Sequence, residues 1–123
     1  MKSKIYFYAV IAIGTMLIAG CSKNTTEPEN KNRSPQISSI IPNPENVMVN
    51  QVTSLTCLAE DADGDQLTYV WEADTGTFNG TGSRVDWTAP GTEGLYQILC
   101  KVMDGNGGEA QQEVMIDVMP PGN

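Results

Sequence analysis

The stretch Tyr96-Gln97-Ile98-Leu99-Cys100-Lys101-Val102 decides the fold class, because apolar side chains return at every second position of it. Side chains two residues apart lie on the same face of a β-strand, so this pattern indicates a strand with one buried face. Four other segments alternate in the same way and are predicted to be strands too: Leu55, Cys57 and Ala59; Leu67, Tyr69 and Trp71; Val85, Trp87 and Ala89; and Val114, Ile116 and Val118.

Turn-forming residues separate these segments at short intervals. They occur at Pro42-Asn43-Pro44, Asp63-Gly64, Thr75-Gly76, Asn79-Gly80, Pro90-Gly91 and 104–108. Short strands at this rhythm are typical of an all-β sandwich, and no window after Cys21 carries an amphipathic helical pattern. We predict one antiparallel sandwich domain of about seven strands over 36–119, followed by a tail over 120–123, since this length suits a single core.

The N-terminus has the parts of an export signal. Lys2 and Lys4 precede an apolar run that ends in Leu17-Ile18-Ala19-Gly20-Cys21. The alternative is a transmembrane anchor, but the run falls short of the roughly 20 apolar residues that a spanning helix needs.

This junction resembles the lipobox of bacterial lipoproteins. The resemblance implies that residues 1–20 are a signal peptide, removed so that Cys21 carries the lipid, including an acyl group such as palmitate. Residues 21–35 hold no large apolar side chain and are predicted to be a disordered tether. In lipoproteins that stay in the inner membrane, an aspartate usually follows the lipidated cysteine as a retention signal. This chain has Ser22 at that position, which favours the outer membrane within the cell envelope.

Composition excludes several function classes. Removing residues 1–20 takes Lys2 and Lys4 from the seven basic residues and leaves fifteen acidic ones in place. So acidic a chain lacks the basic surface that nucleic acid requires. The sequence contains no histidine, which removes the commonest general base and a common metal ligand. We therefore expect no enzyme activity and no nucleic-acid partner.

Longer phrases resemble bacterial immunoglobulin-like domains of the PKD-like or cadherin-like kind. They are Glu60 to Trp71, Val85 to Pro90, Gly94-Leu95-Tyr96 and Val102 to Gly108. The Cys57, Trp71, Cys100 order resembles the immunoglobulin pattern, which implies a Cys57–Cys100 disulfide between the sheets. The alternative is a pair of reduced, buried cysteines. Tyr96 stands four residues before Cys100, whereas the tyrosine of the tyrosine corner in that fold stands two residues before the cysteine.

Two oxygen-rich loops are expected at one end of the domain. Asp61, Asp63 and Asp65 follow one strand, and Asp104 and Asn106 follow another that is antiparallel to it in this topology. The cadherin resemblance implies possible calcium binding by these five residues, since Ca²⁺ takes six to eight oxygen ligands. The alternative is that they serve turn geometry, because Asp and Asn side chains bond to their own backbone.

The resulting functional hypothesis is a non-catalytic envelope lipoprotein, anchored to the membrane through Cys21, whose domain is an interaction or adhesion module for a protein or a glycan. A structural accessory subunit of an envelope complex and a weak calcium-binding module are the alternatives. Exposure of Tyr69, Phe78 or Tyr96 would favour a glycan, because sugars stack on aromatic rings.

Overall fold

The computed structural model describes residues 31–122, which contain strands, turns and bends and no helix. The strands run in the order β2 (Gln36–Asn43), β3 (Asn46–Met48), β4 (Val52–Glu60), β5 (Thr68–Ala73), β6 (Thr77–Asn79), β7 (Arg84–Thr88), β8 (Gly94–Met103) and β9 (Glu109–Met119). The predicted lipobox, Cys21 and most of the tether lie outside the described residues. Among residues 31–122 there is no helix of a length and apolarity that would cross a membrane.

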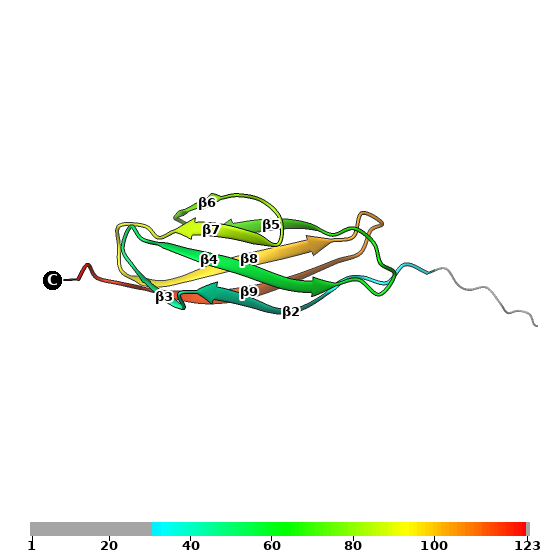
Figure 1. The fold of residues 1–123 in the computed structure, drawn as a ribbon, viewed down its shortest axis with the longest axis horizontal. Helices are drawn as coiled ribbons and strands as arrows, with labels where there is room; N and C mark the ends of the chain where they lie inside the picture. The colour runs from blue at the N-terminus through cyan, green and yellow to red at the C-terminus, as the bar shows by residue number, and fades with distance from the viewer. Residues whose placement is uncertain (1–30, 123) are drawn as a thin grey trace, which may run out of the picture. The chain divides into compact units, whose positions relative to one another are not determined.

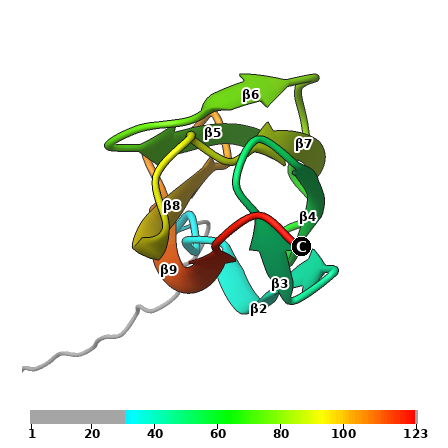
Figure 2. The same cartoon turned by 90° about the vertical axis from the view of Figure 1, so that its left-hand side faces the viewer.

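The eight strands form two four-stranded sheets with the orders β2-β4-β7-β6 and β3-β9-β8-β5. Figures 1 and 2 show the sheets stacked as two layers. All paired neighbours are antiparallel except β3 and β9. The prediction of an all-β immunoglobulin-like sandwich is confirmed. The sequence indicated about seven strands, and β3 is a short additional one that crosses to the second sheet just after Pro44.

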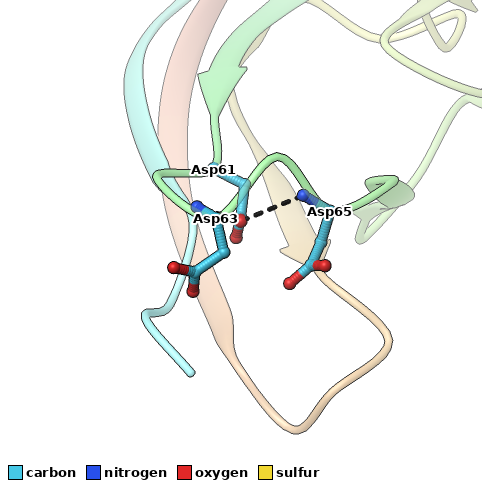
Figure 3. Close-up of side chains that lie close together, drawn as sticks. All are labelled: Asp61, Asp63 and Asp65. Carbon is cyan, nitrogen blue, oxygen red and sulfur yellow. Dashed lines mark hydrogen bonds between the residues drawn. The ribbon is translucent and has the colours of Figure 1, made fainter. Parts of the chain in front are cut away.

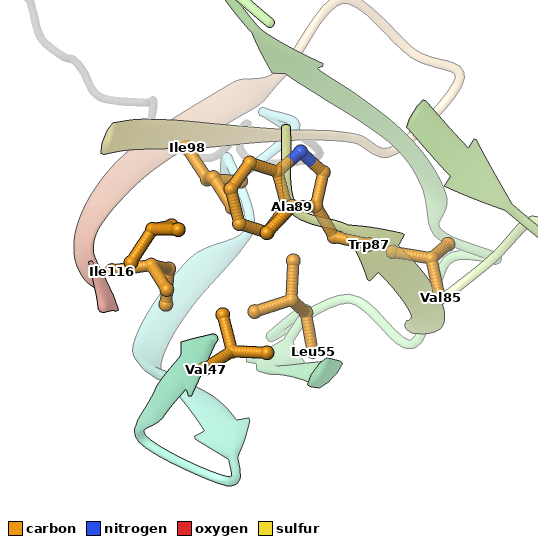
Figure 4. Packing of buried hydrophobic residues seen from close by; sticks show 8 residues of the cluster. Val47, Leu55, Val85, Trp87, Ala89, Ile98 and Ile116 are labelled. Atoms are coloured by element: carbon orange, nitrogen blue, oxygen red, sulfur yellow. The ribbon is translucent and has the colours of Figure 1, made fainter. Parts of the chain in front are cut away.

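The core consists of the side chains that alternation assigned to the interior. Trp87 lies fully buried between the sheets, among Leu55, Ile98 and Ile116 (Figure 4). Burying a large apolar side chain contributes about 1.5–3 kcal/mol, so these residues supply much of the driving force for folding. Gly76 is required beside Trp87, since its φ is 85° and a Cβ there would come within 2.6 Å of the indole atom Cε2.

The two tryptophans have different surroundings. Trp71, which alternation assigned to the buried face of its strand, is half-buried. Its indole N–H donates to the Gly82 carbonyl oxygen at 2.9 Å, and its ring packs against Phe78 at 6.5 Å between centroids. It lies on β5 at the edge of its sheet, where one side has no neighbouring strand. Trp87 lies on the inner strand β7 and is the central core tryptophan.

Tyr96 forms a tyrosine-corner bond despite its unusual spacing from Cys100. Its hydroxyl donates to the backbone oxygen of Thr92, four residues upstream, at 2.9 Å. The ring packs on Trp87, with centroids 6.1 Å apart. The β7–β8 connection is therefore fixed to the core by one side chain, which the spacing alone did not predict.

Candidate functional site

The loop between β4 and β5 is organised by Asp61. Its Oδ1 accepts the backbone N–H of Asp63 at 2.9 Å and of Asp65 at 3.2 Å, and its carbonyl oxygen accepts the N–H of Gly64 at 3.1 Å. Figure 3 shows the three aspartates on this single turn. Asp61 is thus the acceptor around which the turn folds, as the structural interpretation of the sequence expects.

Arg33 binds the Asp63 carboxylate with both its backbone and its side chain. The backbone N–H donates to Oδ2 at 2.7 Å, and the guanidinium nitrogens donate to Oδ1 at 2.6 and 2.9 Å. These bonds hold the pKa of Asp63 below its usual value, and the bond from the backbone N–H is the largest cause. The guanidinium also reaches the carbonyl oxygen of Ala62 at 3.2 Å.

Asp104 has the corresponding role in the β8–β9 hairpin. It is buried, and its Oδ1 accepts the backbone N–H of Asn106 at 2.8 Å and of Gly108 at 2.9 Å. Its Oδ2 accepts the side-chain amide of Asn32 at 2.7 Å. The Asn32 bond is the main cause that lowers the pKa of Asp104, so the carboxylate is held ionised. Asn106 bonds through its backbone, and its side chain is exposed.

These contacts bring both predicted loops and residues 32–34 together at one end of the domain, which we call the acidic end. The compact unit that contains the strands begins at Asn32. Gly108 makes this approach possible, because a Cβ there would overlap the Asp104 carboxylate and lie 2.9 Å from the Ser34 Cα. Sequence reasoning missed Asn32, Arg33 and Gly108. The available signal was a basic residue just before the first strand of an acidic domain.

The acidic end has some of the features of a cation site. Carboxylate oxygens of Asp61, Asp63 and Asp65 lie within 4.8 Å of one another, and Asp61 Oδ2 is buried with no hydrogen-bond partner. Asp63 is already neutralised by Arg33, and both oxygens of Asp104 are taken up by N–H donors. Six to eight oxygens are therefore not free to surround Ca²⁺. The bonds favour the structural role for the side chains of Asp61, Asp63 and Asp104.

Cys57 and Cys100 face each other across the two sheets, in one buried cluster with Ile40 and Val102. The structure records both as free, buried thiols. Burial raises the pKa of both thiols, which suppresses the nucleophilic thiolate. Their disulfide remains a prediction, since the oxidised form depends on the compartment that the protein occupies.

The second region of interest is the outer face of the β3-β9-β8-β5 sheet. The large exposed hydrophobic side chains of residues 31–122 are aliphatic or methionine, and the rings of Tyr69, Phe78 and Tyr96 are half-buried. Four of these exposed side chains gather at the end of this sheet away from the acidic end; we call them the Met–Leu patch: Met48, Leu95, Met115 and Met119.

Three comparisons relate the chain to known proteins. A family model described as a bacterial Ig domain matches residues 32–117. No curated protein matches. A solved structure is similar over 72% of this chain and 26% of its own length, with 22% identity and a TM-score of 0.60; its title describes a nucleoside hydrolase-related hypothetical protein from Saccharophagus degradans that is associated with carbohydrate metabolism. The chain thus spans about a quarter of that protein, and the likeness concerns the fold alone.

Proposed function

This chain belongs to the bacterial Ig domain family, and we propose from that premise that it is a lipid-anchored envelope protein whose domain binds another protein. The family assignment supports the proposal that the domain is a non-catalytic interaction module. The observation that carries the choice of a protein partner is the Met–Leu patch, which offers apolar area to another protein and no exposed aromatic ring for a sugar.

The membrane contact in this proposal is the lipid on Cys21. The lipobox resemblance and the short apolar run before it support an anchored protein. Several acyl chains together keep a protein attached to a bilayer durably. Ser22 favours the outer membrane. The alternative, a structural accessory subunit, would also be a lipid-anchored protein that binds another protein, but as part of an obligate complex. Crosslinking in intact cells separates the accessory subunit from the interaction module.

Replacing Cys21 with serine tests the anchor. We expect Cys21→Ser to move the folded protein from the membrane fraction to the soluble fraction of the cell envelope, measured by fractionation and immunoblotting. Ser22→Ala is the matched control and should leave the protein on the membrane. If Cys21→Ser stays bound to the membrane, the proposed anchor is wrong.

Crosslinking in intact cells tests the interaction. A photoreactive residue is placed in the full chain at Gln97 on one sheet, Leu58 on the other, or Glu93 in the β7–β8 connection. We expect a reproducible protein adduct from at least one position. An adduct that forms with one stoichiometric partner and stabilises both proteins identifies an accessory subunit. No adduct from any of the three positions would contradict a protein-binding function.

Calcium binding is a second candidate, because Asp61 Oδ2 is buried without a partner beside two further carboxylates. The bonds of Arg33 to Asp63 and of Asn32 to Asp104 oppose it. Melting of the protein with and without millimolar calcium tests it.

A further inference from the structure

We infer that the outer face of the β3-β9-β8-β5 sheet binds a protein segment in which a lysine or arginine stands next to apolar side chains. This inference rests on the proposed function and assigns it a surface and a partner chemistry. Four observations carry it: contiguity of the patch, its methionine content, an adjoining acidic hollow and the charge of the whole face.

The Met–Leu patch is contiguous across three strands. Leu95 on β8 stands opposite Asp117 on β9, and Met115 and Met119 flank Asp117 on the same face. Met119 in turn stands opposite Met48 on β3. Directly opposed and diagonal side chains in a sheet lie within contact distance of one another. Leu95 is 68% exposed, so the patch is open to solvent. Single exposed hydrophobic residues are normal, whereas a contiguous group marks a contact surface.

Methionine is concentrated on this face. Alternation along the strands places Met48, Met103, Met115 and Met119, all the methionines of residues 31–122, on the outside of this one sheet. Methionine side chains are unbranched and adapt to the shape of a partner. The surface therefore suits a peptide-like segment better than a single rigid ligand.

An acidic hollow adjoins the patch. Its volume is about 240 Å³ and it is lined by Glu72, Ala73, Asp74, Gln97 and Leu99. Gln97 stands opposite Met115, so the hollow and the patch share a border. Glu72 and Asp74 are exposed and take no part in the ion pairs within residues 31–122. Two carboxylates at a hollow present a binding position for an ammonium or guanidinium group.

The charge of the whole face selects a basic partner. Glu72, Glu109, Glu113 and Asp117 project from this sheet, and its one basic residue, Lys101, is paired with Glu109 at 3.4 Å. A second copy of the chain would bring like charges together, which disfavours self-association. A basic segment would be attracted, and its apolar side chains would cover Leu95 and Met115.

The test uses the chain from residue 21 with Cys21→Ser, which retains the whole compact unit that begins at Asn32. The probe is a short synthetic peptide that alternates leucine and lysine. Control peptides replace leucine with serine, or lysine with glutamate. Binding is measured by calorimetry, and each variant is checked for an unchanged melting curve.

We expect the leucine–lysine peptide to bind and both control peptides to bind about tenfold more weakly or not at all. Leu95→Ser should weaken binding about fivefold, and Glu72→Gln with Asp74→Asn about tenfold, with a reduced dependence on salt. Leu58→Ser is the matched control, an exposed leucine on the opposite sheet, and should leave binding unchanged.

Four results would overturn the inference: no binding of the leucine–lysine peptide, equal binding of the serine–lysine peptide, equal weakening by Leu58→Ser, or a dimer in sedimentation that Leu95→Ser dissociates. In-cell adducts that form from Leu58 or Glu93 and not from Gln97 would also overturn it. They would leave the proposed protein-binding function intact, so the two failures are distinguishable.

Discussion

At the acidic end, Asp63 and Asp104 accept hydrogen bonds from Arg33 and Asn32, whereas in the acidic hollow Glu72 and Asp74 face solvent. Both regions concentrate carboxylates on a domain with a strongly negative charge. In the first, the chain supplies the donors and the carboxylates hold loops in place. In the second, the donors must come from a partner. An acidic cluster is therefore interpreted from the bonds of its oxygens rather than from its density of charge.

The largest effect that we expect from this comparison is on stability. Asp104→Ala removes the acceptor of three N–H groups, two of them from the backbone of the β8–β9 hairpin, and should lower the melting temperature by about 10 °C. Asp74→Ala, in the acidic hollow, should change it by less than about 2 °C. Circular dichroism during heating measures both. Equal shifts would mean that the two regions do not differ as described.

Acid should destabilise the domain through the acidic end. The pKa values of Asp63 and Asp104 are lowered in the folded state, so the unfolded chain binds more protons at low pH. Their contribution is present above the unfolded value of about 3.9 and is lost as pH falls through the lower folded values. Denaturant unfolding between about pH 5 and 2 measures it. The double variant Asp63→Asn, Asp104→Asn should have a flatter profile; an unchanged profile would assign the acid sensitivity to other groups.

A smaller effect than that of Asp104→Ala should come from Arg33, because its pair with Asp63 is exposed. Arg33→Gln should lower the melting temperature by about 2–4 °C, and Lys31→Gln, which removes the same charge two residues earlier, by less.

Calcium binding at the acidic end is tested with the wild-type protein and Asp61→Asn. With Arg33 in place, millimolar calcium should leave the melting temperature unchanged, because the guanidinium occupies Asp63. A calcium-dependent rise in the wild-type protein, absent in Asp61→Asn, would show that the acidic end binds the metal after all.

The fold was predictable from the sequence to a large extent. Leu55, Trp87, Ile98 and Ile116 were each assigned to the interior by alternation, and each is fully buried. Trp71 was assigned in the same way and is half-buried, because alternation identifies the inner face of a strand but not its position in the sheet. The Tyr96 bond to Thr92 was missed because it depends on the conformation of a connection rather than on spacing from Cys100.

The candidate site was predictable only in part. Asp61, Asp63, Asp65, Asp104 and Asn106 were identified as one group, and the structure does place their loops at one end of the domain. Their partners were not identified, because Arg33 precedes Asp63 by 30 residues and Asn32 precedes Asp104 by 72. Likewise, the exposed leucine and methionines were not recognised as a patch, since they come from three strands.

By itself, the sequence determined what has a short period: the strands, their inner faces and the turns between them, because two-residue alternation and turn chemistry act within a few residues. The tertiary structure decided which acidic side chains are satisfied and which remain free. That outcome depends on strand pairing and sheet stacking, which bring distant residues such as Asn32 and Asp104, or Met48 and Met119, next to each other.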